Sequence, residues 1–191
     1  MCGFVGYINK EKDKKDNIKK MADLIAHRGP DSEGYYTDEN IALGFRRLSI
    51  IDLNNGSQPI YNEDKSKVII FNGEIYNFEP LREDLIKKGH TFTTKTDTEV
   101  ILHGYEEYGE KILDKLRGMF AFVIYDKNTK ELFAARDFYG IKPFYYAKMG
   151  NTFIFGSEIK SFLIHPHFKK ELNSKMLEYY LTFQYSPGNE T

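Results

Sequence analysis

Cys2 is the residue whose type and position in this sequence could do chemistry most directly. It is the one cysteine of the chain, and a cysteine without further context is usually a small buried hydrophobic residue. Methionine is commonly removed before a small second residue, and removal of Met1 would give Cys2 both a thiol and a free α-amine. An α-amine has a pKa of about 7.7–8.0 in peptides, so it can act as the general base for the thiol beside it. Cys2 is therefore a candidate N-terminal nucleophile, with Gly3 and Gly6 leaving space for a substrate.

Three further polar positions have an ordinary structural explanation. Asn72-Gly73 follows an apolar run, and this dipeptide strongly favours a turn. Arg46 and Arg47 lie in one predicted strand, where alternation points their side chains to opposite faces, so only one is expected to face a pocket. Asp97 comes directly before a predicted helix and is well suited to cap it. The residue types alone do not decide between these explanations and a role in binding.

No other catalytic or metal motif stands out. The five histidines give no nucleophile–base arrangement, and no Cys/His or carboxylate spacing indicates a metal site. The sequence also lacks the G-x-x-x-x-G-K-[ST] loop and the G-x-G-x-x-G fingerprint that bind nucleotide phosphates. We therefore expect no metal and no cofactor in this part of the chain.

Hydrophobic periodicity predicts strands in two groups with helices between them. The predicted strands cover residues 2–8, 34–37, 41–52, 67–71, 119–125, 132–136, 144–147 and 153–155. The predicted helices cover residues 16–27, 78–88, 98–108, 158–164 and 174–183. This order lacks the strict β-α-β alternation of a doubly wound sheet, so we expect an α+β domain with mainly antiparallel sheets.

The composition changes near the C-terminal end of the sequence. His165-Pro166-His167 interrupts the predicted structure, and a lone helix follows. We expect one domain over residues 2–165, and a linker with the start of a further domain over residues 166–191.

Composition and charge exclude several classes of protein. The chain has 27 Lys and Arg against 28 Asp and Glu, so there is no electrostatic argument for nucleic acid or an anionic membrane. A single cysteine excludes an intramolecular disulfide. The sequence has neither an apolar run of roughly 18 residues nor a secretory signal. We expect a cytoplasmic protein.

The first residues, Met1-Cys2-Gly3-Phe4-Val5-Gly6, resemble the start of the class II glutamine amidotransferases, and most closely the glutamine-hydrolysing asparagine synthetases. Four further stretches carry the same resemblance along nearly the whole chain: HRGPD at 27–31, RLSIID at 47–52, NGEIYN at 72–77, and RD with GIKP within 136–143. The resemblance implies a four-layer α/β/β/α N-terminal-nucleophile fold, in which two mainly antiparallel sheets lie between layers of helices.

The same resemblance implies a glutaminase reaction. The Cys2 thiol would attack the carboxamide carbon of L-glutamine, and a thioester on Cys2 would be hydrolysed to glutamate after ammonia leaves. The Asn72 side chain and the Gly73 N–H would stabilise the oxyanion, where one such donor typically contributes about 3–4 kcal/mol.

Substrate-binding roles also follow from the resemblance. Arg47 would clamp the α-carboxylate of glutamine in two hydrogen bonds. Asp97, assisted by Glu74, would accept the α-ammonium. The complete implied binding set is Arg47, Leu48, Ser49, Ile50, Ile51, Asn72, Gly73, Glu74 and Asp97.

The implied partners are L-glutamine and a C-terminal synthetase domain. The resemblance is also compatible with a homodimer. That domain would use ATP and Mg²⁺ to make asparagine from aspartate with the released ammonia. Three alternatives stay open: an amidotransferase for another carboxylate acceptor, a non-catalytic dimerisation or regulatory remnant, and an N-terminal-nucleophile hydrolase of a peptide or acyl amide. The last is disfavoured because Arg47, Asn72-Gly73 and Asp97 together suit a free amino acid.

Overall fold

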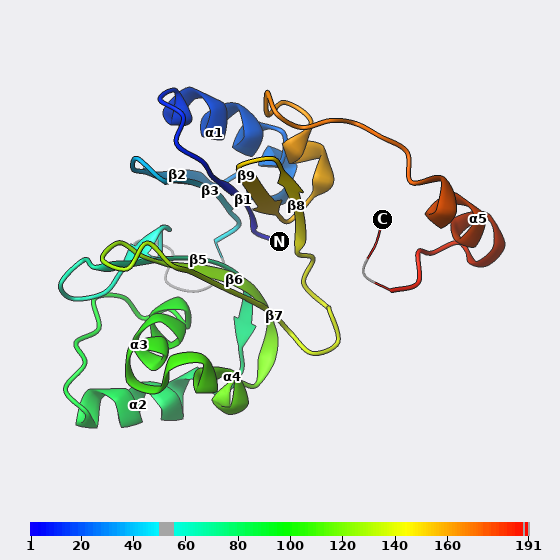
Figure 1. Ribbon diagram of the computed structural model, residues 1–191. Helices are drawn as coiled ribbons and strands as arrows, with labels where there is room; N and C mark the ends of the chain where they lie inside the picture. Colours follow the sequence, from blue (N-terminus) through cyan, green and yellow to red (C-terminus); the bar gives the residue numbers. More distant parts are fainter. Residues whose placement is uncertain (50–55, 189, 191) are drawn as a thin grey trace.

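Two antiparallel sheets lie face to face in the computed structural model, which describes residues 1–49, 56–188 and 190. Helices cover the outer face of each sheet, so the order of layers is helix, sheet, sheet, helix (Figure 1). The predicted α+β fold with four layers is confirmed. No helix in the described residues has the length and apolar composition needed to cross a membrane.

The first sheet is built around the N-terminal strand. It has the order β2-β3-β1-β9-β8, so β1 lies at its centre with hydrogen-bonded neighbours on both sides. Its strands are β1 (Gly3–Ile8), β2 (Ser32–Thr37), β3 (Ile41–Arg47), β8 (Tyr145–Met149) and β9 (Thr152–Gly156). Every residue of β1 except Ile8 is buried, which explains why this segment is almost continuously apolar.

The second sheet has the order β4-β5-β6-β7. Its two central strands are its longest and are paired over nine residues. The strands are β4 (Ile60–Tyr61), β5 (Lys67–Ile75), β6 (Gly118–Asp126) and β7 (Leu132–Arg136). β4 pairs with β5 only at Val68 and Ile69. Along the rest of this edge, side chains instead of a strand form hydrogen bonds with the backbone of β5.

The helices pack on the apolar outer faces of the two sheets. α1 (Lys14–Asp23) packs on the first sheet, while α2 (Phe78–Lys87), α3 (Thr98–Tyr108) and α4 (Ile112–Lys115) lie against the second (Figure 1). The 3-10 turns are η1 (Ala26–Arg28), η2 (Gly109–Lys111) and η3 (Ile159–Phe162). α5 (Ser174–Phe183) stands apart from the sheets and buries only Met176 among its residues.

Three clusters of buried side chains fill the spaces between the four layers. One lies between the two sheets and includes Phe4, Phe45 and Ile70. Another joins α1 to the first sheet, and the third joins α3 and α4 to the second. Each element therefore buries its apolar face against a neighbouring layer.

Several sequence-based boundaries were wrong. The helix predicted over residues 16–27 ends at Asp23, and its last residues form a 3-10 turn. Asn72-Gly73 lies inside β5 rather than in a turn, because pairing with β6 overrides the local preference of the dipeptide. The strand predicted over 41–52 ends at Arg47 as far as the structure describes it, and 158–164 forms only a short 3-10 turn. The short elements β4 and α4 were not predicted.

Candidate active site

Cys2 lies where the central strand of the first sheet begins. β1 and β3 are antiparallel with Gly3 opposite Arg46, so the start of β1 meets the end of β3. This register places Cys2 beside Arg47 and Leu48, the residues that leave β3. The chain terminus is thus held inside the fold rather than left to fray.

The Cys2 sulfur sits between the backbone groups of Leu48. The Leu48 N–H donates to Sγ at 3.3 Å, and Sγ lies 3.4 Å from the Leu48 carbonyl oxygen. Burial raises the pKa of the Cys2 thiol, while the Leu48 backbone, the N-terminal ammonium and Arg47 oppose this rise. A thiol with a raised pKa needs a nearby base to become a nucleophile at neutral pH.

The backbone of Cys2 is fixed by a second set of contacts. Arg28 Nε donates to the Cys2 carbonyl oxygen at 3.0 Å, and Arg28 Nη1 lies 3.1 Å from Glu158 Oε1. His27 Nε2 lies 2.9 Å from the same Glu158 oxygen. A side chain at Gly3 would place its Cβ 2.8 Å from Arg28 Cδ, so glycine is needed for this close approach. The motif 27–31 therefore holds the backbone of Cys2 through Arg28, and the partner Glu158 was missed in the sequence because it lies far along the chain.

Asn72 brings a side-chain amide to the space between the sheets. Val68 and Ile70 pack in the inter-sheet core that Cys2 also contacts, and alternation along β5 points Asn72 to the same side. Its side chain is buried, and Nδ2 has no hydrogen-bond partner among the described residues. A buried donor without a partner typically destabilises a fold by about 1–3 kcal/mol, which marks a position where a ligand oxygen is expected.

The direction of the Gly73 backbone N–H follows from the pairing of β5 with β6. Phe120 is the residue of β6 opposite Gly73. Its N–H donates to the Asp137 side chain, and its carbonyl oxygen accepts from the Asp137 N–H. In an antiparallel pair this makes Gly73 a non-hydrogen-bonded partner of Phe120, so the Gly73 N–H points away from β6. A Cβ at Gly73 would lie 2.3 Å from the Met119 carbonyl oxygen, which explains why this strand position has no side chain.

The neighbouring N–H groups on that edge of β5 are both occupied. Phe71 N–H donates to Gln58 Oε1 at 2.6 Å, and Gln58 Nε2 donates back to the Phe71 carbonyl oxygen at 3.0 Å. Ile75 N–H donates to Asp97 Oδ2 at 2.8 Å. Gly73 lies between them, beyond the reach of β4. The side chains of Gln58 and Asp97 thus bond to the N–H groups on either side of Gly73. The Gly73 N–H lies between these two bonds, at the cleft.

Arg46 and Arg47 face different surroundings, as alternation requires. Arg46 forms ion pairs with Asp23 and Glu33 on the side of α1. Arg47 is buried at 6% exposure and lines the cleft beside Cys2. The structure therefore puts Arg47, and not Arg46, where it could bind a substrate.

Asp97 is a buried carboxylate beside this cleft. It precedes α3, but its side chain makes no capping bond to that helix. Burial raises its pKa to about 6, and the nearby Glu74 carboxylate contributes to this rise, whereas the Ile75 N–H opposes it. A buried carboxylate whose charge is poorly compensated would be favoured by a cationic ligand group.

One open cleft gathers most of the predicted residues. It encloses about 420 Å³ including solvent space. Its lining comes from the start of β1, the end of β3, the segment before β4, the second half of β5 and the start of α3. The lining residues are Cys2, Arg47, Leu48, Gly56, Gln58, Phe71, Gly73, Glu74, Thr96, Asp97 and Thr98. Gln58, Thr96 and Thr98 were not predicted, since nothing in their local sequence distinguishes them from ordinary polar loop residues.

Two predicted residues that the structure describes, Ser49 and Asn72, are not among these lining residues. Ser49 N–H donates to Asp31 Oδ2 at 2.7 Å, which gives Ser49 a role in shaping the segment after β3. Ile50 and Ile51 lie outside the described residues.

Comparison with known proteins places this arrangement in a family. The profile of the glutamine amidotransferase domain matches residues 1–191. Asparagine synthetase [glutamine-hydrolyzing] 1 of Bacillus subtilis is 50% identical over 196 aligned positions, which cover 100% of this chain and 31% of that protein. Asparagine synthetase [glutamine-hydrolyzing] 3 of Arabidopsis thaliana is 44% identical over 84% of this chain and 28% of its own length. The chain thus spans less than a third of the length of these curated relatives.

A solved structure shares the fold. The glutamine phosphoribosylpyrophosphate amidotransferase from B. subtilis, complexed with ADP and GMP, superposes with a TM-score of 0.72 over 85% of this chain and 43% of that chain, at 22% sequence identity. The match over the whole sequence, together with the shared fold and the cleft at Cys2, shows that the chain belongs to the glutamine amidotransferase domain family.

Proposed function

We propose that this domain hydrolyses L-glutamine to glutamate and ammonia, with Cys2 as the nucleophile. The observation that carries the proposal is the cleft, in which a thiol, a buried arginine, an open backbone N–H and a buried carboxylate meet. These groups come from elements far apart in the sequence, and each matches one part of a glutamine molecule.

The two charged ends of the amino acid account for two of these groups. Arg47 would bind the α-carboxylate through paired N–H donors. Asp97 would accept the α-ammonium, whose positive charge favours the ionised form of this buried carboxylate and offsets its proximity to Glu74. A site that binds both charges selects a free amino acid over an amide within a peptide.

Attack on the side-chain amide follows from the position of Cys2. After Met1 is removed, the α-amine of Cys2 takes the thiol proton, and sulfur forms a bond to the carboxamide carbon. The negative charge that develops on the amide oxygen would be stabilised by Asn72 Nδ2 and the Gly73 N–H. Asn72 Nδ2 has no hydrogen-bond partner among the described residues, and the Gly73 N–H points away from β6 at the cleft, so little rearrangement is needed to engage the oxygen.

Collapse of the tetrahedral intermediate breaks the carbon–nitrogen bond. The protonated α-amine returns its proton to the leaving nitrogen, and ammonia departs while a γ-glutamyl thioester remains on Cys2. Water, deprotonated by the same amine, then attacks the thioester carbon. Glutamate leaves and the Cys2 thiol is restored, so the enzyme returns to its starting state.

The use of the ammonia is a further part of the proposal. The relatives are named as glutamine-hydrolysing asparagine synthetases and are about three times longer than this chain. We infer that ammonia passes to a synthetase domain joined to this one, which would make asparagine from aspartate with ATP and Mg²⁺, in the cytoplasm. Another carboxylate acceptor is the alternative. A homodimer stays a prediction.

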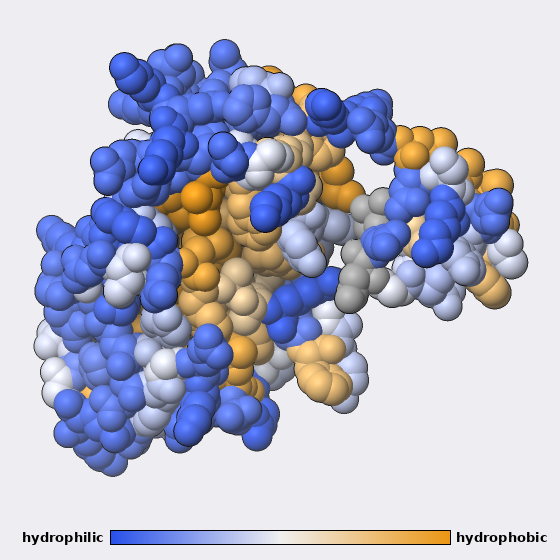
Figure 2. Space-filling view, in the orientation of Figure 1, coloured by the Kyte–Doolittle hydropathy of each residue, from blue (hydrophilic) through white to orange (hydrophobic). Residues whose placement is uncertain are grey.

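An exposed apolar surface supports contact with such a domain. Figure 2 shows hydrophobic residues on α5 and along the middle of the visible face. Large apolar side chains that are exposed include Leu177, Tyr180, Leu181 and Phe183 on α5 and Phe138, Tyr139 and Ile141 after β7. Apolar patches of this kind usually mark contact with another protein surface.

The test combines intact mass with release of glutamate from glutamine. The wild-type chain should lack Met1 and release glutamate, whereas Cys2→Ala should release none. A chain with an uncleaved N-terminal extension is the matched control, because it keeps the thiol but has no α-amine on Cys2. We expect this control to be inactive and to recover when the extension is cleaved.

A second measurement separates binding from turnover. A glutamine analogue that carries an electrophilic carbon in place of the amide should add its mass to the wild-type chain at Cys2 and not to Cys2→Ala. Full glutaminase activity in Cys2→Ala would overturn the proposal. A processed wild-type chain that neither turns over glutamine nor reacts with the analogue would favour the non-catalytic alternative.

A further inference from the structure

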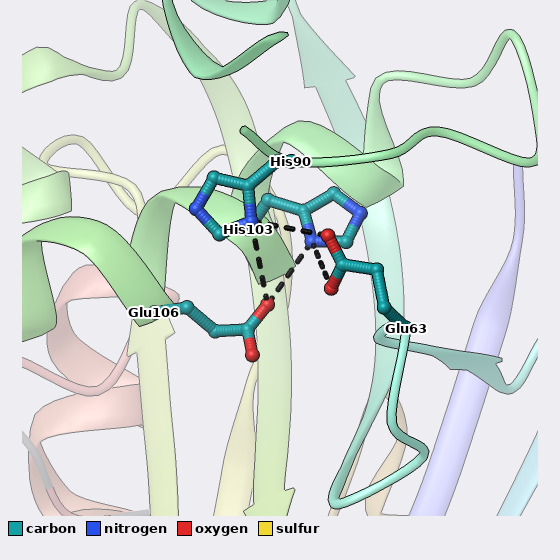
Figure 3. A group of neighbouring side chains, drawn as sticks. All are labelled: Glu63, His90, His103 and Glu106. Atoms are coloured by element: carbon teal, nitrogen blue, oxygen red, sulfur yellow. Dashed lines mark hydrogen bonds and ion pairs between the residues drawn. The ribbon is translucent and has the colours of Figure 1, made fainter. Parts of the chain in front are cut away.

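Four side chains that could ligate a metal meet on the helical side of the second sheet. They are Glu63 in the loop between β4 and β5, His90 after α2, and His103 and Glu106 on α3 (Figure 3). One donor atom from each lies within 4.8 Å of the other three. None of the four lines the cleft at Cys2, so this cluster is separate from the proposed active site.

The donor separations suit a small tetrahedral ion. His103 Nδ1 lies 3.0 Å from Glu106 Oε2 and 3.3 Å from Glu63 Oε2. His90 Nδ1 lies 3.2 Å from Glu63 Oε1 and 4.0 Å from Glu106 Oε2. Tetrahedral Zn²⁺ with bonds of about 2.0–2.1 Å keeps its donors about 3.3–3.4 Å apart. The four donors lie within 4.8 Å of one another, so they would have to close in to about 3.3–3.4 Å to enclose one ion.

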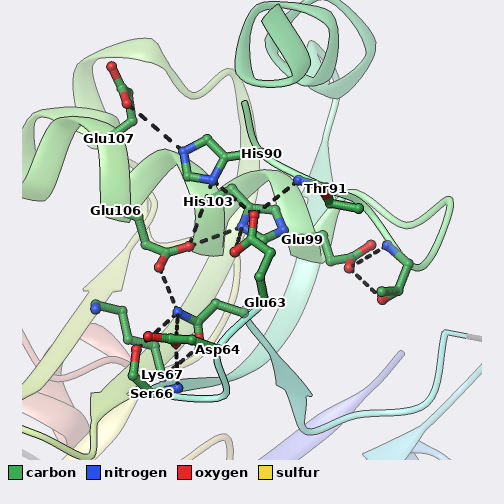
Figure 4. A network of polar contacts seen from close by, with 12 residues as sticks. Glu63, Asp64, Ser66, Lys67, His90, Thr91, Glu99, His103, Glu106 and Glu107 are labelled. Carbon is green, nitrogen blue, oxygen red and sulfur yellow. Dashed lines mark hydrogen bonds and ion pairs between the residues drawn. The ribbon is translucent and has the colours of Figure 1, made fainter. Parts of the chain in front are cut away.

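Outer contacts already orient three of the four side chains (Figure 4). Asn62 Nδ2 donates to Glu106 Oε1 at 2.6 Å, which turns the other oxygen toward both histidines. The Thr91 N–H donates to Glu63 Oε1 at 3.0 Å. Glu107 Oε2 lies 3.9 Å from His90 Nε2 and leaves Nδ1 facing the cluster. A carboxylate behind a histidine in this way is the usual outer shell of a zinc ligand.

The charge of the cluster also favours a cation. Glu63 and Glu106 bring two carboxylates toward one histidine nitrogen, His103 Nδ1. That nitrogen can donate at most one proton, so it cannot satisfy both carboxylates in a linear hydrogen bond. The side chains of Glu63 and Glu106 are 36% and 18% exposed, so water compensates their charge only in part. A divalent ion would neutralise both carboxylates at once.

We propose that Glu63, His90, His103 and Glu106 form a structural binding site for one Zn²⁺ ion. Two imidazole nitrogens and two carboxylate oxygens are a ligand set for Zn²⁺ or a similar transition metal, whereas Mg²⁺ and Ca²⁺ prefer oxygen ligands alone. The ion would join α3 to the β4–β5 loop and to the segment after α2. Sequence reasoning did not find this site, because the ligands are spread over residues 63–106 and follow no short motif.

The test is zinc binding by the whole 191-residue chain, measured by calorimetry with ZnCl₂ and by metal content after dialysis. We expect one Zn²⁺ per wild-type chain, and no comparable binding of Mg²⁺ or Ca²⁺. Glu63→Gln and His90→Gln alter the two ligands that lie in loops, 36% and 15% exposed, so they should fold without metal. Loss of an outer-shell partner weakens metal affinity about 10–100-fold, and loss of a ligand should weaken it by at least about 100-fold.

His167→Gln is the matched control. His167 Nε2 also faces a carboxylate, Glu11 Oε1 at 3.0 Å, but it lies outside the cluster and is 50% exposed. Zinc at about 100 times its dissociation constant should raise the melting temperature of wild type and His167→Gln by about 5–10 °C. It should leave Glu63→Gln and His90→Gln unchanged. Absence of stoichiometric binding, or wild-type affinity in both cluster variants, would overturn the proposal and leave four residues joined by ion pairs only.

Discussion

Replacing Asp97 by Asn should stabilise the folded domain while it weakens glutamine binding. Asp97 is 5% exposed, and burial raises its pKa from 3.8 to about 6. At 1.36 kcal/mol per pKa unit, this rise corresponds to about 3 kcal/mol of destabilisation of the folded state at pH 7. Asn has nearly the same shape and can still accept the Ile75 N–H, so the variant removes the charge and keeps the contact.

The pH dependence gives the sign of this effect. Between pH about 4 and about 6 the folded state keeps a proton on Asp97 that the unfolded chain has released. The contribution of Asp97 to stability is therefore fully present below pH about 4 and is lost as the pH rises through about 6. In Asp97→Asn this part of the pH dependence should be absent.

Chemical denaturation at several pH values measures the stability, and glutamate release measures binding. At pH 7 we expect Asp97→Asn to gain up to about 3 kcal/mol, or about 5–10 °C in melting temperature. Loss of the partner of a buried ammonium costs about 2–4 kcal/mol, which corresponds to a rise in KM of about 30-fold to 1000-fold. Glu83→Gln removes the same charge from an exposed position on α2 and should change neither quantity appreciably.

Two results would refute this reasoning separately. If Asp97→Asn is less stable than wild type at pH 7, burial does not penalise the charge and the carboxylate is compensated within the protein. If the variant is more stable but its KM for glutamine is unchanged, Asp97 does not bind the α-ammonium.

Three further substitutions test the other groups of the cleft. Asn72→Ala should lower kcat about 10²–10³-fold with little change in KM, and should not reduce the melting temperature, because Nδ2 makes no hydrogen bond within the described residues. Arg47→Lys should raise KM for glutamine at least about 10-fold, since a single ammonium cannot form the paired bonds of a guanidinium; an unchanged KM would remove Arg47 from the site. Gly73→Ala should disturb pairing of β5 with β6, because its Cβ would lie 2.3 Å from the Met119 carbonyl oxygen, and a fall in melting temperature would show it.

The sequence predicted the layers of the fold better than the contacts that complete the cleft. Long periodic segments such as 78–88 and 98–108 gave helices close to the observed bounds. The local preference of Asn72-Gly73 favours a turn, and it carries no information about the strand formed by residues 118–126 that pairs with it. The choice of Arg47 over Arg46 followed from strand alternation together with the family motif, and the structure puts the two side chains on different sides.

Residues whose role depends on distant partners were beyond sequence reasoning. Glu158 meets Arg28 only because η3 follows β9, and β9 pairs with β1. Gln58 resembles any polar loop residue until its amide is seen to pair with both backbone groups of Phe71. The proposed zinc site was not predicted for the same reason, since its four residues come together only when the loops before β5 and after α2 lie against α3.

The position of Cys2 would give the proposed nucleophile a rigid setting although it lies next to a chain terminus. Terminal residues are usually mobile, because nothing holds them on one side. Here the terminus leads directly into the central strand of a sheet, and Phe4 is bound through its N–H to Ser157 Oγ at 3.1 Å and through its carbonyl oxygen to the Ser157 N–H at 2.8 Å. Arg28 fixes the Cys2 carbonyl, and the Leu48 backbone fixes the sulfur. An amine released by removal of Met1 would therefore start within reach of the thiol with few conformations to lose, and this preorganisation is what a base built from the chain terminus requires.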